Sequence, residues 1–387
     1  MTLNYVVSSD SHIFEPLDLW ENALGTKWGD KVPRLVNECE GVSGNYFYLG
    51  HEYIDLDNVE PEEAADSTGD AVPLDPELLD KVNRCSDDPG LRLELMDLDG
   101  VSAEVINSSF LLFSMRIAHP PLLRDVCTVY NDWIAEYCGH DPKRLLAAAM
   151  LPTDDVDWAV AEMQRLARKG IRTVCIYTDV KPHMPPYRDR YYDPLWAASV
   201  DLDMPITLHI ITGQVRDPFT IVHDHERDQI ARMMIEVFSD VGPILANEFM
   251  FGGIFDRFPR LKVILGEYEV SWVPWFLFRI QQIQGSLGQS LKIAPIKKPV
   301  EEYLQTQVWH GFVDDKYADR AFDVAGPTQV MWGSDFPHVR NTFPNTHKIL
   351  ERVLANVDEE TRANVVGLNC ARLFNLDVPT PARAAAE

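Results

Sequence analysis

The sequence predicts one large α/β domain, a (β/α)8 TIM barrel in which eight parallel strands are closed into a ring by crossover helices. Two observations lead to this fold. Short apolar windows rich in β-branched residues occur eight times before residue 336, and amphipathic helical stretches lie between most of them. Strand–helix alternation over this length is typical of a parallel sheet closed into a barrel, which carries its chemistry at the carboxyl ends of the strands.

The strand and helix windows follow from hydrophobic periodicity and turn residues. The strands are expected at Tyr5–Asp10, Val101–Asn107, Leu145–Leu151, Ile171–Tyr177, Pro205–Ile210, Lys262–Glu269, Thr306–Phe312 and Gln329–Asp335. Helices are expected at Pro121–Cys138, Val156–Lys169, Pro194–Val200, Gln229–Phe238 and Lys316–Val324. Because these windows span the chain, we expect a single domain over residues 1–378, followed by a flexible tail at residues 379–387.

The stretch between the first two strands, about residues 24–90, is too long for an ordinary loop. It contains a predicted hairpin around Gly44–Tyr53 and an acidic, proline-containing segment, Asp57–Asp80. A helix over Arg92–Asp99 then leads into the second strand. Since the insert leaves from the active end of the first strand, we expect it to cover the barrel mouth or to serve as an arm in an oligomer.

Acidic residues and histidines stand at the ends of four of the predicted strands. Side chains alternate along a strand, so Asp10 and His12 point the same way and can reach one ion. His209, Glu267 and Asp335 end the fifth, sixth and eighth strands. Because the strand ends meet at one rim, this pattern predicts a metal-binding site at the barrel mouth.

The sixth and eighth strands are each expected to bring a carboxylate inward above apolar layers. In the sixth strand, Val263, Leu265 and Glu267 are predicted to share the inner face. In the eighth strand, Asp335 follows Met331 and Gly333 in the same way.

Composition narrows the class of protein. The 387 residues include 46% hydrophobic and 25% charged residues, which is ordinary for a globular enzyme. The formal charge of −25 disfavours nucleic acid as a partner. The sequence shows neither a secretory signal nor an apolar run long enough for a bilayer, so we expect a cytoplasmic protein with a small-molecule substrate and no membrane partner. The six cysteines lack CxxC pairing and are expected to be buried thiols.

Five motifs in order resemble a known family. They are Asp10–His12 with Phe14–Pro16, Arg92–Asp97, Phe258–Lys262, Glu267 with Ser271–Pro274, and Trp332–His338. Together they resemble the amidohydrolase-related metal-dependent family (amidohydrolase 2) that includes aminocarboxymuconate-semialdehyde decarboxylase, over nearly the whole chain. The resemblance implies a TIM barrel with one catalytic divalent metal ion per subunit, and hydrolysis or non-oxidative decarboxylation of small, often aromatic or ring-derived acids. It assigns the ligand roles to Asp10, His12, His209 and Asp335.

The chain departs from the family pattern at two strands. The first strand has Asp10-x-His12 where many relatives have His-x-His or Glu-x-His, and this harder oxygen ligand makes manganese or magnesium credible beside zinc. Glu267 stands where the decarboxylases typically carry a histidine. The fourth strand, Ile171–Tyr177, lacks the lysine that bridges two metals in binuclear barrels, which favours one ion.

The predicted catalytic residues are Asp335, Glu267 and His338. In hydrolysis a metal-activated water needs a carboxylate base, for which Asp335 is the family-like choice and Glu267 a second base or substrate acceptor. In decarboxylation an acid must instead protonate the ring carbon, and Glu267 could do so only if burial raises its pKa. His338 either hydrogen-bonds to Asp335 or the substrate, or only closes the loop.

Further residues are candidates for substrate binding or support. Arg216 and Arg340 follow the fifth and eighth strands and could pair with a substrate carboxylate, or be ordinary loop residues. Trp309 and Phe312 could stack on a flat substrate, although barrel packing explains them equally well. Glu15 is expected to support the ligands from behind or to begin a helix before Pro16.

Three functions are compatible with this pattern. The first is a metal-dependent hydrolase acting on a small organic acid, amide or lactone, favoured because Glu267 replaces the histidine. The second is a non-oxidative decarboxylase of an aromatic acid. The third is a barrel that binds metal and ligand without turnover. In each case we expect a homodimer or homotetramer.

Overall fold

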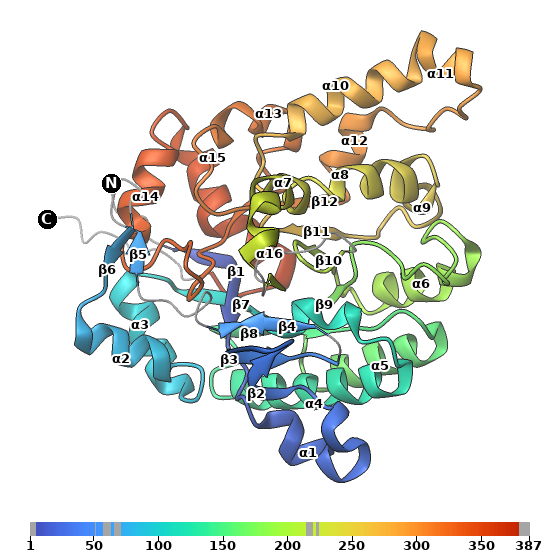
Figure 1. Cartoon of the computed structure of the whole chain (residues 1–387). Helices are drawn as coiled ribbons and strands as arrows, with labels where there is room; N and C mark the ends of the chain where they lie inside the picture. The colour runs from blue at the N-terminus through green and yellow to red at the C-terminus, as the bar shows by residue number, and fades with distance from the viewer. Residues whose placement is uncertain are drawn as a thin grey trace, which may run out of the picture.

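The computed structural model describes residues 5–378, apart from residues 51, 57–62, 66–70, 214–219 and 222–223. Its centre is a ring of eight parallel strands that follow one another in chain order, with helices around it (Figure 1). The strands are β1 (Val7–Ile13), β7 (Ala103–Ser108), β8 (Leu145–Met150), β9 (Thr173–Ile176), β10 (Ile206–His209), β11 (Val263–Gly266), β12 (Val308–Phe312) and β13 (Val330–Trp332). Each overlaps one predicted window, so the predicted TIM barrel is confirmed.

The ring closes between the ends of β13 and β1. The backbone N–H of Asp335 donates to the carbonyl of Asp10 at 2.9 Å, and that of His12 donates to the carbonyl of Phe336 at 2.7 Å. Gly333 allows this approach, because a Cβ there would lie 2.6 Å from the Cβ of Asp10. Closure therefore sets two predicted metal-binding strand ends side by side.

Helices cover the outside of the ring and one of its ends. The outer helices include α4 (Pro120–Cys138), α5 (Val156–Arg168), α6 (Asp193–Asp201), α7 (Ile230–Val237), α10 (Val273–Gln284), α13 (Phe322–Ala325), α14 (Thr346–Val353) and α15 (Glu359–Ala363). The predicted helix at Lys316–Val324 is divided into a 3₁₀ turn, Ala318–Arg320, and α13. The last helix, α16 (Asn369–Phe374), closes the end of the ring where the strands begin. Three of its residues pack inside the ring, in an inner core that also contains Val7 and Ala103. The opposite end of the ring is thereby left for the site.

The insert after β1 forms its own small elements against the barrel. They are α1 (Leu19–Trp28), β2 (Arg34–Cys39), β3 (Val42–Tyr48), β4 (Tyr53–Asp55), β5 (Glu63–Ala65), β6 (Ala71–Pro73), α2 (Pro76–Arg84) and α3 (Pro89–Asp99). The ring of Phe47 in β3 stacks on Phe110, which follows β7, with centroids 4.5 Å apart. The insert thus packs on a loop at the carboxyl end of the barrel, as predicted, while residues 57–62 and 66–70 of the acidic segment lie outside the described residues.

Two further features of the chain can be checked in the part that the structure describes. All six cysteines are buried free thiols, as predicted. Within the same residues, no helix has the length and apolarity needed to cross a membrane. The predicted tail, residues 379–387, lies outside the described residues.

Candidate metal centre

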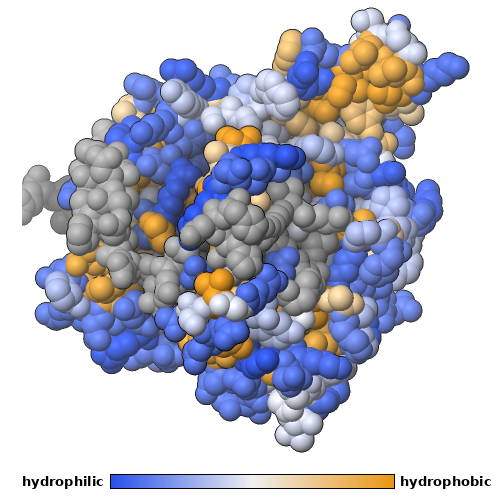
Figure 2. All heavy atoms as spheres, in the orientation of Figure 1, coloured by the Kyte–Doolittle hydropathy of each residue, from blue (hydrophilic) through white to orange (hydrophobic). Residues whose placement is uncertain are grey.

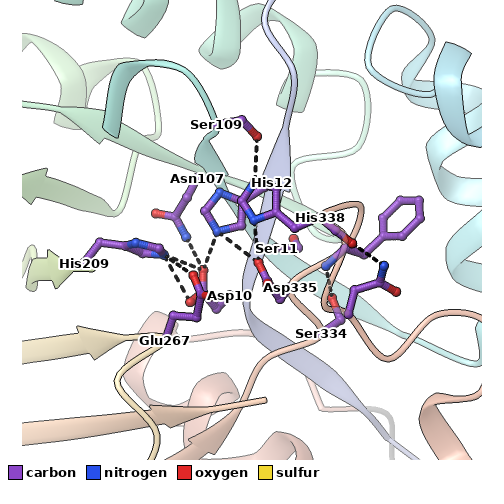
Figure 3. A network of polar contacts seen from close by, with 12 residues as sticks. Asp10, Ser11, His12, Asn107, Ser109, His209, Glu267, Ser334, Asp335 and His338 are labelled. Carbon is purple, nitrogen blue, oxygen red and sulfur yellow. Dashed lines mark hydrogen bonds and ion pairs between the residues drawn. The ribbon is translucent and has the colours of Figure 1, made fainter. Parts of the chain in front are cut away.

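The acidic and histidine residues at the strand ends form two overlapping groups that could hold a metal ion (Figure 3). One group is Asp10, His12, His209 and Glu267, and the other is His12, Glu267, Asp335 and His338. Nε2 of His12 lies 3.4 Å from Oδ1 of Asp10 and 3.5 Å from Oδ1 of Asp335. Nε2 of His209 lies 3.3 Å from Oδ2 of Asp10 and 3.9 Å from Oε2 of Glu267. Residues separated by more than 300 positions therefore lie around one small region of the mouth, where His12 and Glu267 join the two groups.

Hydrogen bonds fix both imidazoles with Nε2 toward this region. Nδ1 of His12 lies 2.9 Å from the carbonyl oxygen of Ser108, and Nδ1 of His209 lies 3.1 Å from that of Ile210. A carbonyl only accepts, so Nδ1 carries the proton and donates it, which leaves the lone pair on Nε2. Nε2 of His12 is buried without a hydrogen-bond partner. A buried nitrogen in this state fits a metal ligand.

The electrostatics of the cluster favour a cation. Burial raises the pKa of Glu267 well above its ordinary value, and the neighbouring Asp335 and Asp10 raise it further. Burial likewise raises the pKa of Asp335 to about 7, although His12 opposes the shift. For His209, burial lowers the pKa but the attraction of Asp10 outweighs it, so the net shift is upward. Three crowded, buried carboxylates attract positive charge, and a divalent ion would satisfy them.

The donor set also indicates the class of ion. Two imidazole nitrogens and up to three carboxylate oxygens suit zinc, and the oxygen-rich part of the set suits harder ions such as manganese. The side chain of Asn107 donates to Oδ1 of Asp10 at 2.8 Å and so holds that carboxylate in place. The residues present therefore fit one divalent metal ion.

Glu267 reaches the site by a different route from the one predicted. The predicted inner face of Val263, Leu265 and Glu267 is wrong, because Val263 and Leu265 pack outward while Ile264 belongs to the inner core. Glu267 instead follows the last strand residue, Gly266, with a left-handed φ of 65° that turns its side chain into the mouth.

His338 is part of the site and does more than close the loop. Its Nδ1 lies 2.8 Å from Oδ1 of Asp335, its Nε2 lies 3.0 Å from Oγ of Ser109, and its ring stacks on His12 at 4.0 Å. Burial, with a further contribution from His209, lowers the pKa of His338 to about 3. A neutral His338 can therefore exchange a proton with Asp335 on one side and Ser109 on the other.

Glu15 lies behind the site and contacts the turn after β7. Its carboxylate accepts hydrogen bonds from the Ser108 hydroxyl and from the backbone N–H of Phe110 at 3.1 Å. The same Ser108 accepts from His12 through its carbonyl. Burial raises the pKa of Glu15, although these hydrogen bonds oppose the shift. Glu15 thus holds the turn that orients a histidine of the site.

Of the predicted substrate-binding residues that the structure describes, one lies at the cavity and two do not. Arg340 lies at the rim of the cavity described below and donates to Oε1 of Glu269 at 2.9 Å. Trp309 instead belongs to the inner core near α16, and Phe312 packs outward against Phe322. Neither aromatic residue lines the cavity, because inward residues of β12 fill the barrel below the site and the others face the helices. Arg216 lies outside the described residues.

Three functional residues were missed from the sequence. Asn107, Ser108 and Ser109, at the end of β7, bind Asp10, His12 and His338 respectively. In the sequence, the run of three polar residues at the end of an apolar strand window was the signal that could have indicated them.

A cavity of about 250 Å³ opens directly beside the metal centre. Glu267, Asp335 and His338 form its polar side. Most of the other described lining residues are apolar, and Ile54 comes from β4 of the insert. The insert therefore completes the wall of the cavity as well as packing on the barrel.

Comparison with known proteins identifies the family. The family model described as "Amidohydrolase" matches residues 83–376. The chain belongs to this family and is an enzyme of the amidohydrolase superfamily. This confirms the resemblance seen in the sequence motifs.

Sequence relatives carry the names of decarboxylases. The chain is 26% identical over 313 residues to gamma-resorcylate decarboxylase of Rhizobium sp. (strain MTP-10005), covering 76% of this chain and 89% of that one. It is 22% identical over 297 residues to 2-amino-3-carboxymuconate-6-semialdehyde decarboxylase of Dictyostelium discoideum, covering 75% and 77%. These relatives overturn the expectation of hydrolysis in favour of the alternative, decarboxylation. A glutamate in place of the histidine at position 267 therefore does not by itself indicate hydrolysis.

Solved structures confirm the fold. An amidohydrolase from Mycobacterium avium subsp. paratuberculosis K-10 matches with a TM-score of 0.73 and 20% identity, covering 96% of this chain and all (100%) of that one. A 5-carboxyvanillate decarboxylase from Novosphingobium aromaticivorans, complexed with manganese, matches with a TM-score of 0.67 and 17% identity, covering 97% and 100%.

Proposed function

We propose that the protein is a metal-dependent carboxy-lyase that removes the carboxylate of a hydroxylated aromatic acid without oxidation. The observation that carries the proposal is the hydrogen bond between the buried Asp335 and the partly exposed His338 in the wall of a largely apolar cavity, directly beside the proposed metal ligands. Decarboxylation of an aromatic ring needs a proton donor and a site shielded from water, and this arrangement provides both. The names of the sequence relatives support the same reaction.

Asp10, His12 and His209 would hold the metal ion, together with carboxylate oxygens of Asp335 and Glu267. Manganese is the ion we favour, because the donor set is rich in oxygen and a structural relative is complexed with it. When bound, the ion would hold the substrate carboxylate and a neighbouring phenol oxygen and draw electron density from the ring.

Asp335 is the proposed proton donor. Its carboxyl group protonates the ring carbon that bears the carboxylate, the bond between that carbon and the carboxylate carbon breaks, and its electrons restore the aromatic ring as carbon dioxide leaves. His338, hydrogen-bonded to Asp335 and 23% exposed at its side chain, returns a proton to Asp335 from the solvent side. Each turnover consumes one proton and releases one molecule of carbon dioxide.

Glu267 replaces the histidine that family decarboxylases typically carry, and it requires a role of its own. Its Oε2 lies 3.9 Å from Nε2 of His209, and the residue also lines the cavity. We assign Glu267 to metal binding and to contact with the oxygen atoms of the substrate that face the ion. The Glu267→Gln variant should therefore lose metal affinity, whereas Asp335→Asn should lose proton transfer before it loses the ion.

The test is carbon dioxide release from a panel of 2-hydroxybenzoates by the manganese-loaded protein. In D2O the product should carry deuterium at the vacated ring carbon. Asp335→Asn should reduce the rate on the order of 10²- to 10⁴-fold, with metal content measured as its control. No carbon dioxide from any acid, or full activity in metal-loaded Asp335→Asn, would contradict the proposal.

A further inference from the structure

Apolar side chains of three separate segments form a large part of the cavity wall. Ile54 comes from the insert, Phe110 and Phe113 come from the turn after β7, and Met234 and Val237 come from α7. Four of these residues, Ile54, Phe110, Phe113 and Val237, also belong to the main hydrophobic core. The apolar wall is therefore continuous with the core and is assembled from several elements, not from one.

Polar groups are confined to two edges of the cavity among the described lining residues. Ser109, Glu267, Asp335 and His338 lie at the metal edge, and Arg340 lies at the mouth, where it pairs with Glu269. Within the described part of the lining, a hydroxyl or carboxylate elsewhere on a bound ring would meet apolar side chains. A buried polar group without a partner weakens binding by about 10-fold or more.

We infer that the substrate carries an apolar substituent, an alkyl chain or a second ring, on the side of the aromatic ring away from the carboxylate. This inference rests on the proposed decarboxylase function and adds the substrate class to it. The carboxylate and the adjacent hydroxyl face the metal edge, and the apolar substituent occupies the space between the insert and α7. A compact dihydroxybenzoate would leave that space empty.

The test compares kcat/KM for unsubstituted 2-hydroxybenzoate with values for its 4- and 5-alkyl, phenyl and hydroxyl derivatives. Val237 is 3% exposed, and Val237→Thr places a hydroxyl in the wall with almost no change in volume. Ile235→Gln is the matched control, because Ile235 lies on the same helix, is 73% exposed and is not part of the lining.

We expect at least one alkyl or phenyl derivative to exceed the parent acid by 10-fold or more, and Val237→Thr to reduce this preference while Ile235→Gln does not. Equal or better use of the hydroxyl derivatives, or a preference that Val237→Thr leaves unchanged, would overturn the inference. If no acid releases carbon dioxide, the proposed function fails, and calorimetric binding of the same panel to the manganese-loaded protein still measures the apolar preference.

A second, independent inference concerns the arm formed by α10 and α11 (Ser286–Leu291), which projects from the barrel (Figure 1). One face of α10 packs on the barrel through buried residues that include Phe276 and Ile280. The opposite face exposes Trp275 and Phe278, at 63% and 53%, and in α11 Leu291 is 63% exposed. Figure 2 shows this apolar patch at the upper right of the molecule. A helix that is apolar on both faces is typical of one covered on both sides.

The arm differs in charge from the rest of the chain. Residues 270–300 contain four basic residues and no aspartate or glutamate, whereas the chain as a whole has a net charge of −25. The basic residues are Arg279 in α10 and, just after α11, Lys292, Lys297 and Lys298. Lys297 and Lys298 pair with Asp256 and Glu302 of the same chain, so Arg279 and Lys292 carry the charge argument. A surface that is complementary to this arm in charge is therefore present on another copy of the same chain.

We propose that the apolar face of the arm, with Trp275, Phe278 and Leu291, is the surface that contacts a second copy of the chain in the homo-oligomer expected from the sequence. A two-fold axis would bring the apolar faces together and set each basic arm beside the acidic body of the partner. An anionic lipid surface is the other occupant of suitable chemistry, but the strongly acidic remainder of the chain would be repelled by it.

Mass measurement in solution by light scattering tests this proposal with the metal-loaded full chain. The wild type should be a dimer or larger, and Phe278→Glu/Leu291→Glu should be a monomer with unchanged metal content and circular dichroism. Leu98→Glu is the matched control, because Leu98 is 61% exposed on α3 away from the arm. A monomeric wild type, an oligomer that survives the double substitution, or binding to phosphatidylserine vesicles that the double substitution abolishes would each overturn the proposal.

Discussion

Arg92 joins the two strand ends that carry the metal ligands, and its removal gives a sharply defined prediction. It is fully buried, and its Nε donates to Oε1 of Glu104 at 2.5 Å. Its other nitrogens donate to the carbonyl oxygens of His12 at 2.8 Å and Phe336 at 3.4 Å. Phe336 follows Asp335, so one guanidinium holds β1 and the segment after β13 together.

The size of the effect follows from this geometry. Arg92→Met fills a similar volume but leaves the Glu104 carboxylate buried without its cation, which should cost about 3–5 kcal/mol of the free energy of unfolding. The double variant Arg92→Met/Glu104→Met removes both charges and should recover most of that loss. It should not recover metal affinity, because the carbonyl group of His12 still lacks its Arg92 donor and that of Phe336 keeps only the His12 N–H. We expect metal binding 10- to 100-fold weaker in both variants.

Urea unfolding of the metal-loaded proteins measures the first effect, and competition with a chelator measures the second. A cost of less than 1 kcal/mol for Arg92→Met would refute the reasoning about the buried charge. Wild-type metal affinity in the double variant would refute the positioning role of Arg92.

Three further outcomes are expected. Gly266→Ala should weaken metal binding about 10- to 100-fold, measured by chelator competition, because the added Cβ would lie 2.5 Å from the His209 ring; Gly25→Ala, with open space at its Cβ, should have no effect. Burial raises the pKa of Asp99 to about 7, although Thr346 opposes the shift, so its folded form keeps a proton that the unfolded chain releases near pH 4. As the pH rises from 4 to 8, the wild type should therefore lose on the order of 2–4 kcal/mol of its free energy of unfolding relative to Asp99→Asn. If the urea midpoints of the two proteins change by the same amount over this range, the prediction is wrong. Removal of the metal by a chelator should lower the thermal midpoint, and its return at 100 times Kd should restore about 2.7 kcal/mol.

The barrel was predictable because its strands are continuous apolar windows separated by amphipathic helices. The proposed ligands were predictable for a related reason, since each stands at or near the end of an apolar strand window. His209 points inward by simple alternation, and Asp10 and His12 share one face for the same reason. In β1 a register shift between Ser8 and Ser11 turns that face inward above Val7.

What the sequence could not show depends on backbone conformations and long-range contacts. Glu267 faces the site through a left-handed φ of 65°, so alternation assigned the wrong partners to it in β11. Trp309 lies inside the ring but far from the carboxyl end of β12, so it packs in the inner core and does not reach the cavity. Composition does not show how far along a strand a side chain will lie from the site. Arg92 was recognised as part of a motif, but its hydrogen bonds to two distant strand ends are visible only in the folded chain.

The central claim is that one divalent ion is held where the strand ends meet. The most direct measurement is the anomalous scattering of crystals grown with manganese, collected at the manganese edge. We predict a single strong peak per chain at about 2.0–2.3 Å from Nε2 of His12, Nε2 of His209 and an oxygen of Asp10. Absence of a peak among these atoms, or a peak elsewhere in the chain at full occupancy, would contradict the account.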